Sequence, residues 1–390
     1  MLYLDHNATT PVLPEVADAV LDTMRRHWAN PSSPHEAGQA ARGCLQEARA
    51  KVARFLGCQP TEVVFTSGAT EANHIALRGA IGHGGRRGLV LSAAEHAGVH
   101  KLAQHLARQD ASVRVIGLDA QGALRLDEAD ALINEDTALV SVMAANNETG
   151  VLMPTAEMAR LAHARGALLH VDATQLVGKL PFEFERSGAD LVSVSAHKFG
   201  GPKGVGALVV RRGLNWTSLF QGSQERGRRG GTENLPAIVG MGVAADVQQW
   251  TSANWHQRTV KLAALRDQFE ARLRAACLEL HVYGQSQSRL PQTSYLRLGM
   301  VHADLALKRL SELGVMAASG SACSSGGQAA SPVLTAMGVP RDEALCAVRL
   351  SLSVDTPEAA LMSLAERWPQ SLRSALESTT APRSPTGVPA

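Results

Sequence analysis

The sequence predicts an α/β protein with a mostly parallel sheet in a large domain and a second, smaller α+β domain. The chain has 390 residues, which is more than one ordinary hydrophobic core accommodates. Apolar runs alternate with helical periodicity over roughly 150 residues, which favours a parallel sheet covered on both faces. Polar clusters follow several of these runs, as ligand-binding residues do at the carboxyl ends of parallel strands.

The elements of the large domain follow from periodicity. Helical patterns cover 14–28 and 36–56, and the Pro- and Ser-rich stretch between them is a loop. Further helices are expected up to 81, at 99–108 and at 155–165. Strands are expected at 62–66, 89–92, 113–116, 138–143, 167–171 and 189–194.

The chain is expected to be helical from 235 to about 279, and the smaller domain begins within this stretch. We place the boundary at 248–255, so that 12–252 form the large domain while 1–11 and 253–378 form the small one. Strands are expected there near 294–298, 315–317 and 347–352, and helices near 303–313, 332–337 and 357–376. The segment 379–390 is rich in Pro, Ser and Thr and is expected to be disordered.

Composition excludes several classes of protein. The formal net charge is +2 and no basic stripe carries interleaved aromatic residues, which argues against nucleic acid as a partner. No apolar run reaches the ~20 residues that span a bilayer, and the N-terminus shows no signal peptide, so we expect a cytoplasmic protein. Five cysteines without CxxC spacing argue against a disulfide framework or a zinc site.

Lys198 follows an apolar strand and precedes a turn rich in Gly and Pro. A lysine held at the end of a buried strand loses its proton more easily, because desolvation disfavours the ammonium form. The neutral amine forms a Schiff base with an aldehyde, which is how pyridoxal phosphate enzymes hold their cofactor. A surface lysine beside a turn is the alternative, and this stretch alone leaves both open.

The turn Ser67-Gly68-Ala69-Thr70 leads from a strand into a helix. Free backbone N–H groups and the positive end of the helix dipole at such a point suit a phosphate, and Thr70 adds a hydroxyl donor. The alternative is a plain helix cap by Ser67.

Asp172 and His96 also follow predicted strands. A carboxylate at the end of a buried strand needs a cationic partner, and a protonated pyridine nitrogen is one. A helix cap is the alternative for Asp172. His96 is suited to stacking on such a ring and moving protons, although a lone histidine is more often structural.

Cys323 lies among small residues in Ser319-Gly320-Ser321-Ala322-Cys323-Ser324-Ser325-Gly326-Gly327. Flanking glycines would let a thiolate approach a bound substrate and withdraw, whereas an exposed loop cysteine is the alternative. Cys346 lies in an apolar run and is expected to be inert. Arg349 lies in a strand-like run and is expected to point inward unless it faces solvent; a bidentate carboxylate partner would explain the inward position.

Eight motifs stand in one order along residues 2 to 375. They are Tyr-Leu-Asp-His-Asn-Ala-Thr-Thr-Pro at 3–11, Thr-Ser-Gly-Ala-Thr-Glu at 66–71, Glu-His at 95–96, Asn-Asn-Glu-Thr-Gly at 146–150, His-Val-Asp-Ala-Thr-Gln at 170–175, Ser-Ala-His-Lys at 195–198, Arg-Gly-Gly-Thr at 229–232 and Ser-Gly-Ser-Ala-Cys at 319–323. Together they resemble the cysteine desulfurases of the NifS and IscS type. Those enzymes are class-V aminotransferases of pyridoxal phosphate fold type I, so the resemblance implies a seven-stranded sheet.

The resemblance also implies a role for each site residue. Lys198 would hold the cofactor aldehyde as a Schiff base, Asp172 would pair with the pyridine nitrogen, Gln175 would contact the ring hydroxyl, and His96 would stack as acid and base. The remaining residues divide between phosphate and substrate carboxylate. Ala69, Thr70, Ser195 and His197 would hold the phosphate, with Thr232 from the partner subunit of a homodimer, and Asn147 and Arg349 would hold the carboxylate.

The activity implied is conversion of L-cysteine to L-alanine, with the sulfur taken by Cys323 as a persulfide and passed to an acceptor or scaffold protein for iron–sulfur clusters or thiolation. Alternatives are a selenocysteine lyase, a related aminotransferase or a catalytically silent scaffold. A nicotinamide Rossmann domain is disfavoured because no Gly-x-Gly-x-x-Gly follows the first strand. Gln221 and Ser223 stand where the family usually has glycine, and the C-terminal tail is short.

Overall fold

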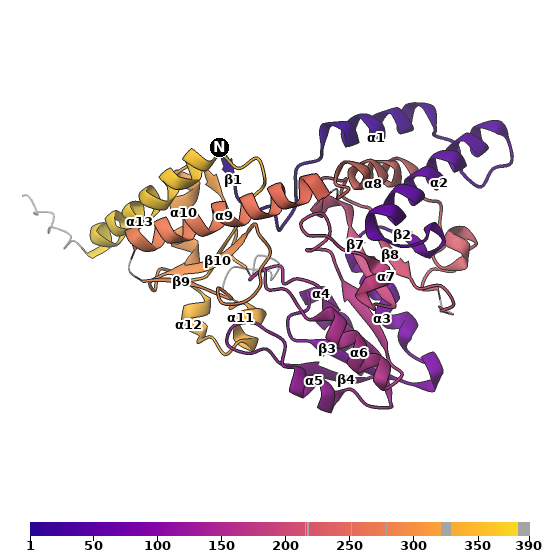
Figure 1. Cartoon of the computed structure of the whole chain (residues 1–390), viewed down its shortest axis with the longest axis horizontal. Helices are drawn as coiled ribbons and strands as arrows, with labels where there is room; N and C mark the ends of the chain where they lie inside the picture. The colour runs from indigo at the N-terminus through magenta and orange to yellow at the C-terminus, as the bar shows by residue number, and fades with distance from the viewer. Residues whose placement is uncertain (215, 217, 251, 278, 321–328, 381–390) are drawn as a thin grey trace, which may run out of the picture.

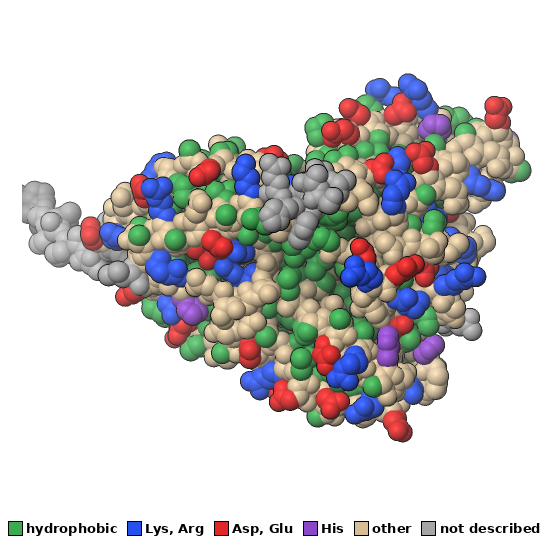
Figure 2. Space-filling view, in the orientation of Figure 1, with side chains coloured by type: hydrophobic (Ala, Val, Ile, Leu, Met, Phe, Trp, Pro, Cys, Tyr) green, Lys and Arg blue, Asp and Glu red, His purple; other side chains and the backbone are tan. Residues whose placement is uncertain are grey.

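The computed structural model describes residues 1–214, 216, 218–250, 252–277, 279–320 and 329–380. A seven-stranded sheet with its helices forms one part of the molecule, and a three-stranded and a two-stranded sheet with long helices form the other (Figure 1). Hydrophobic side chains gather near the middle of one face, whereas charged side chains lie mainly over the outer elements (Figure 2). None of the described helices is long and apolar enough to span a membrane.

The large sheet has the strand order β2-β8-β7-β6-β5-β3-β4. Its strands are β2 (Val63–Thr66), β3 (Gly88–Ser92), β4 (Ser112–Ile116), β5 (Thr137–Met143), β6 (Leu168–Asp172), β7 (Leu191–Ser195) and β8 (Gly206–Val210). Among the described pairs of this sheet, β2 with β8 and β7 with β8 are antiparallel, and the others are parallel. The predicted mostly parallel, seven-stranded sheet is therefore confirmed, although periodicity had located only six of its strands.

Both faces of this sheet are covered, as predicted. Alternate side chains of β2 enter different hydrophobic clusters, with Val63 and Phe65 on one face and Val64 on the other. The first cluster includes residues of α2 (Glu36–Leu56), α5 (Leu126–Leu132), α6 (Thr155–Ala164) and α8 (Leu235–Val247). The second includes residues of α3 (Ala69–Ala80) and α4 (Ala97–Ala107). The central strands β5, β6 and β7 are buried on both faces and are therefore mainly apolar, which explains why most runs lack a polar residue at every second position.

The rest of the chain builds its own core around Leu4, Phe269 and Trp368. β1 (Leu2–Tyr3) pairs with β11 (Val315–Met316), and β10 (Thr293–Leu298) lies between β9 (Leu280–Val282) and β12 (Val348–Ser351). The remaining helices are α1 (Pro14–Arg26), α7 (Phe184–Ser187), α9 (Ser252–Ala276), α10 (Ala303–Glu312), α11 (Pro332–Ala336), α12 (Arg341–Ala344) and α13 (Glu358–Thr380). The N-terminal segment thus packs with the C-terminal part, and the proposed domain boundaries stay a prediction.

Two local expectations need comment. Helix α13 continues to Thr380, while the rest of the predicted disordered tail lies outside the described residues. Ser223 adopts ordinary helical dihedral angles, and the positive φ angles of this loop fall on Glu225 and Arg226 instead. The carboxylate of Glu225 is buried, and its oxygens accept hydrogen bonds from both terminal nitrogens of Arg49 at 2.8 and 2.6 Å. This paired, hydrogen-bonded contact helps to hold the unusual backbone.

Gly206, the first residue of β8, lies between the ends of β2 and β7. It lies opposite Thr66 on β2 and Ser195 on β7. A Cβ at this position would lie 2.5 Å from the Val194 carbonyl oxygen and 2.7 Å from the Cα of Gly68. The turn after β2 can approach β8 so closely only because residue 206 has no side chain.

We predict that Gly206→Ala lowers the free energy of unfolding by about 1–3 kcal/mol, because the methyl group overpacks a rigid backbone contact. Gly43→Ala is the matched control, since Gly43 lies inside α2 with nothing within 4 Å of its Cβ position. The control is expected to be neutral or stabilising by up to about 1 kcal/mol. Chemical denaturation of both variants measures the difference, and equal stabilities would contradict the role of Gly206.

Candidate active site

A cavity of about 590 Å³ lies at the carboxyl ends of the parallel strands. The helix start after β2, the loop after β6 and the residues after β7 contribute to its wall. Most of the residues predicted for the site line this one cavity: Ala69, Thr70, His96, Asn147, Asp172, Gln175, Ser195, His197 and Lys198. The residues that the sequence singled out thus meet at one cavity, whereas their individual roles stay predictions.

Lys198 lies in the short turn that follows β7 and is half-buried. Its Nζ donates hydrogen bonds to the carbonyl oxygens of Asn7 at 2.6 Å and Ala8 at 2.9 Å. The N-terminal segment therefore closes over the amine from the other part of the molecule. A plain surface lysine is the wrong description of this residue, because the amine lines the cavity and contacts a segment 190 residues away in sequence.

The turn after β2 ends at Gly68, the N-cap of α3, whose φ of +152° is accessible mainly to glycine. No side chain caps this helix, so the expected alternative of a cap by Ser67 is wrong. The first N–H groups of a helix have no intrahelical acceptor, and those of Ala69 and Thr70 belong to this first turn. The Ser195 hydroxyl lies across from Gly68, 3.6 Å from the Cβ position of that glycine.

Asp172 ends β6 and is buried. One carboxylate oxygen accepts a hydrogen bond from the side-chain amide of Asn73 at 2.8 Å, and the other accepts from the backbone N–H of Thr174 at 3.0 Å. The residues after it form turns rather than a helix, so the helix-cap alternative is wrong. Two donors fix the carboxylate at the cavity wall.

A second carboxyl group, that of Glu95, lies close enough to interact with Asp172. Burial, and then the charge of Asp172, raises the pKa of Glu95 well above its ordinary value. One of its oxygens accepts a hydrogen bond from the Met143 N–H at 2.5 Å. Two neighbouring buried carboxyl groups do not both ionise readily, so Glu95 stays neutral beside Asp172.

His96 is both a structural and a cavity residue. Its Nδ1 accepts a hydrogen bond from the Gly98 N–H at 3.1 Å and so caps α4. In the neutral ring the proton therefore lies on Nε2. The capping bond fixes the ring orientation, and His96 lines the cavity. The structural and functional interpretations of this histidine are thus compatible.

Positive groups accumulate around the cavity. The pKa of His197 is lowered to about 4 by burial and by Lys198, Lys179 and Lys203. Burial and the charge of Lys198 lower the pKa of Lys179 well below its ordinary value. Lys179 donates to the side-chain oxygen of Gln175 at 2.9 Å, and the amide nitrogen of Gln175 donates to the Asn7 carbonyl at 2.8 Å. An anionic ligand would relieve this repulsion.

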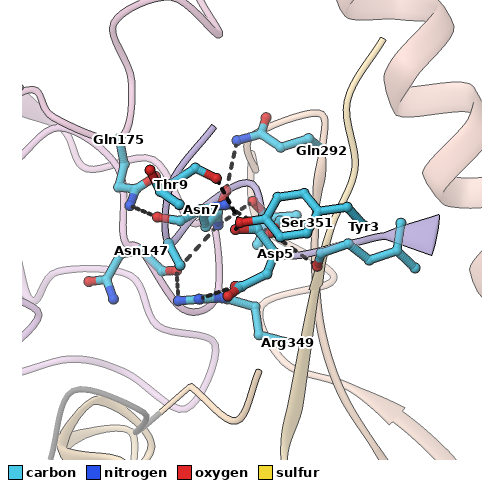
Figure 3. A network of polar contacts seen from close by, with 12 residues as sticks. Tyr3, Asp5, Asn7, Thr9, Asn147, Gln175, Gln292, Arg349 and Ser351 are labelled. Carbon is cyan, nitrogen blue, oxygen red and sulfur yellow. Dashed lines mark hydrogen bonds and ion pairs between the residues drawn. The ribbon is translucent and has the colours of Figure 1, made fainter. Parts of the chain in front are cut away.

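Arg349 is buried, as predicted for an inward-pointing guanidinium. In this structure it donates to Asp5 at 2.8 Å and to the Asn147 carbonyl at 3.0 Å (Figure 3). The amide of Asn7 also donates to that carbonyl, at 3.2 Å. The carboxylate partner expected for Arg349 is thus present within the chain, as Asp5.

Of the described residues predicted for the site, two do not line this cavity: Arg349 and Thr232. Thr232 is exposed and lines a separate cavity of about 200 Å³ beside Ser67 and Arg229. Cys323 lies outside the described residues.

Sequence reasoning missed several residues that the fold places next to the site. Asp5 and Asn7 lie in the first motif, but only the tertiary structure brings that motif over Lys198 and Arg349. Asn73, the partner of Asp172, lies one helical turn after the phosphate-type turn. Lys179 follows Gln175 by four residues, a spacing that was the one available signal.

Comparison with known proteins identifies the family. The family model described as aminotransferase class-V matches residues 2–364. The chain belongs to the class-V aminotransferases. A cysteine desulfurase from Cereibacter sphaeroides is 41% identical to this aminotransferase over 372 residues, covering 94% of this chain and 95% of the relative. The chain therefore lies among the cysteine desulfurases of the family.

Solved structures agree with this membership. A NifS-like protein is 32% identical and superposes with a TM-score of 0.87, over 96% of this chain and 99% of that protein. SspA in complex with cysteine is 29% identical, with a TM-score of 0.80, over 90% of this chain and 99% of that one. The class-V aminotransferase thus has pyridoxal phosphate fold type I.

The cofactor of class-V aminotransferases is pyridoxal 5′-phosphate, and the residues of this chain fit it. The cavity offers an amine, a buried carboxylate and a helix start, the three groups that an aldehyde, a pyridine nitrogen and a phosphate require. The buried Oδ1 of Asn73 and Oγ1 of Thr174, on either side of Asp172, have no hydrogen-bond partner among the described residues. A polar ligand at this wall would supply partners.

Glu148 is a further buried acid, and it lies beside Asn147. Burial raises its pKa to about 7, opposed by hydrogen bonds from Ser331 and Tyr295 and by the charges of Arg349 and His96. In the unfolded chain the ordinary value of 4.5 applies. The native protein therefore binds this proton more tightly, and the associated stability is full below pH 4.5 and is lost as pH rises through about 7.

We predict that the free energy of unfolding of the wild type, relative to Glu148→Gln, falls by about 2–3 kcal/mol between about pH 5 and pH 8. Denaturant titrations across this range measure the difference. Glu157→Gln is the control, because Glu157 is exposed and its pKa is lowered by Arg160. A constant difference between the wild type and Glu148→Gln would show that the buried carboxyl does not titrate in this range.

Proposed function

We propose that the protein is a pyridoxal phosphate-dependent cysteine desulfurase that converts L-cysteine to L-alanine and takes the sulfur onto Cys323 as a persulfide. The observation that supports this most directly is the convergence of Lys198, Asp172 and the start of α3 on one cavity. The curated relative named cysteine desulfurase supports the reaction, and the relative bound to cysteine supports the substrate.

The residues that would hold the cofactor follow from their chemistry. Lys198 would hold its aldehyde carbon, Asp172 its pyridine nitrogen, and Gln175 its ring hydroxyl. The N–H groups of Ala69 and Thr70, with Ser195 and His197, would hold the phosphate. When bound, the cofactor withdraws electrons from the substrate and so acidifies its Cα–H bond.

Asn147 and Arg349 would bind the substrate carboxylate. Arg349 already donates to a carboxylate, that of Asp5, and to a carbonyl. A substrate carboxylate would therefore exchange with Asp5 or share the guanidinium with it. The guanidinium is buried and its Nε has no partner among the described residues, so this donor stays available to an anion beside Asp5.

His96 would move a proton within the site. Its Nδ1 is held by the Gly98 N–H, so Nε2 is the atom that exchanges protons with a bound substrate. Because the capping bond fixes the ring, proton transfer does not require a rotation of His96.

The sulfur transfer balances without an outside oxidant. The Cys323 thiolate attacks the substrate sulfur, an S–S bond forms, and the Cβ–S bond breaks with its electron pair passing to the carbon side. Cβ is reduced because its bond to the thiol sulfur is replaced by a C–H bond on protonation, and the Cys323 and substrate sulfurs are together oxidised to the persulfide level. L-Cysteine and a thiol thus yield L-alanine and a persulfide. An acceptor or scaffold protein for iron–sulfur clusters or thiolation would then receive the sulfur.

A homodimer completes this proposal. Thr232 is exposed and separated from the cavity of its own chain, so we infer that it supports the phosphate site of a second copy. Light scattering or sedimentation of the purified protein measures the mass, and a monomer with full activity would contradict this. The cytoplasmic location expected from the sequence stays a prediction.

The alternative functions differ in what they require. A selenocysteine lyase or an aminotransferase would not need Cys323, and a silent scaffold would not need the Lys198 cavity. The retention of Lys198, Asp172 and His96 around one cavity favours an enzyme over a scaffold.

We predict that Lys198→Ala abolishes the visible absorption of the lysine-bound cofactor, whereas Cys323→Ala keeps that absorption and loses cysteine-dependent sulfide release. The reason is that the amine anchors the cofactor and the thiol acts only on sulfur. Absorbance spectra with and without L-cysteine, followed by assays of alanine and persulfide, measure both effects. Sulfide release by the Cys323 variant at the wild-type rate would remove Cys323 as nucleophile. Alanine formation by Cys323→Ser would favour the lyase alternative, and a protein colourless after added cofactor would favour the scaffold.

A further inference from the structure

Glu148 lies in the turn after β5, and its neighbour Asn146 makes that turn rigid. The side-chain oxygen of Asn146 accepts hydrogen bonds from the backbone N–H groups of Glu148 and Thr149, each at 2.9 Å. Its amide donates to the Ala94 carbonyl at 3.2 Å. Because the backbone is fixed in this way, the Glu148 side chain has a defined starting point, and it is only 6% exposed.

The carboxyl group of Glu148 is hydrogen-bonded to hydroxyl groups from two other segments. Ser331 Oγ donates to its Oε2 at 2.5 Å, and the Tyr295 hydroxyl is hydrogen-bonded to the same carboxyl group. Ser331 also accepts from the Leu334 N–H at 3.1 Å and thereby caps α11. The single acid thus joins β10, the start of α11 and the turn after β5.

Gly320 is packed directly against the same oxygens. A Cβ on Gly320 would lie 2.3 Å from the Tyr295 hydroxyl oxygen and 2.6 Å from Glu148 Oε2. Gly320 and Ser331 flank residues 321–328, which include Cys323 and lie outside the described residues. Glu148 therefore contacts the chain on both sides of the segment to which Cys323 belongs.

The substrate side of the site is tied to the same place. Glu148 follows Asn147, whose carbonyl accepts from Arg349. Ala318, two residues before Gly320, exchanges backbone hydrogen bonds with Arg349 at 2.7 and 3.3 Å. The groups around the acid are Arg349 on β12, His96 at the start of α4, Tyr295 on β10 and Ser331. All four lower the pKa of Glu148 and so favour the ionised form, against burial, which raises it.

We propose that Glu148 is a positioning residue for sulfur transfer: it holds Gly320 and Ser331 in register with the turn that presents Asn147, and so sets how Cys323 meets the substrate. This inference rests on the function proposed above. It assigns to Glu148 no contact with substrate or cofactor. We expect its effect mainly in the step in which the thiol acts: Glu148 does not line the cavity around Lys198 and Asp172, although its charge interacts with Arg349 and His96.

The two protonation states of Glu148 differ in the number of hydrogen bonds that the carboxyl group can accept. An ionised carboxylate accepts hydrogen bonds at both oxygens, so Ser331 and Tyr295 can donate together. A protonated carboxyl must use one oxygen as a donor, which competes with a hydroxyl donor. Since the pKa of Glu148 is raised to about 7, the two states exchange near neutral pH. The sulfur-transfer rate is therefore expected to rise with pH through this region.

The experiment uses the cofactor-loaded enzyme in single turnover with L-cysteine from about pH 6 to pH 9. Mass spectrometry after alkylation measures persulfide on Cys323, and the substrate-induced change in visible absorption measures the preceding steps. Glu148→Gln is expected to slow persulfide formation at least about tenfold, remove its inflection near neutrality and leave the absorption change within about twofold. Ser331→Ala removes a donor to the carboxylate, so it is expected to move the inflection to higher pH.

Two controls separate positioning from general damage. Glu148→Asp keeps the charge and is expected to retain a pH inflection. Glu62→Gln removes the charge of another buried acid, which accepts from the Gln59 and Arg212 N–H groups away from the cavity, and is expected to leave the persulfide rate unchanged.

The possible results are distinguishable. Unchanged persulfide formation in Glu148→Gln, or equal slowing of the absorption change, would overturn the inference. If Glu148→Gln does not fold, a wild-type pH profile in Ser331→Ala would overturn it as well. Sulfide release by Cys323→Ala would instead refute the proposed nucleophile, whatever the Glu148 variants do.

Discussion

The constraint on which the site depends is the desolvation of charged groups at the end of a sheet that is buried on both faces. Asp172 lies at the end of β6, and Lys198 follows the end of the adjacent β7. In this setting an ion without partners is too costly to retain. Asn73 and the Thr174 N–H serve Asp172, and the carbonyls of Asn7 and Ala8 serve Lys198. The positions of Asp172 and Lys198 are therefore set by the hydrogen-bond partners that offset their desolvation.

The same constraint explains why the N-terminal segment crosses between the two parts of the molecule. Leu4 is anchored in the core around Trp368, while Asp5 and Asn7 reach Arg349 and the neighbourhood of Lys198. A shift of this segment would change the partners of the amine and of the guanidinium together. One short segment, residues 4–8, therefore packs into the core around Trp368 and also supplies hydrogen-bond partners to Arg349 and Lys198.

The sequence was sufficient for the class of fold, the order of most elements and a set of residues that meet at one cavity, because strand ends converge in a parallel sheet. It was insufficient for β8, whose apolar run follows a Gly- and Pro-rich turn and whose antiparallel direction is a tertiary property. Asn73 and Asp5 escaped prediction for a related reason: their partners lie 99 and 344 residues away. The segment with Cys323 lies outside the described residues, so its predicted role has no structural comparison.

Two buried acids near the cavity show how one physical effect has two outcomes. Burial raises the pKa of both Glu95 and Glu148. The neighbour of Glu95 is Asp172, whose negative charge adds to the effect and keeps the acid neutral. Around Glu148 stand Arg349, His96 and two hydroxyl donors, which counter burial and bring the pKa to about 7. Glu95 therefore stays neutral beside Asp172. Glu148, which contacts Gly320 and Ser331, changes charge near neutral pH instead.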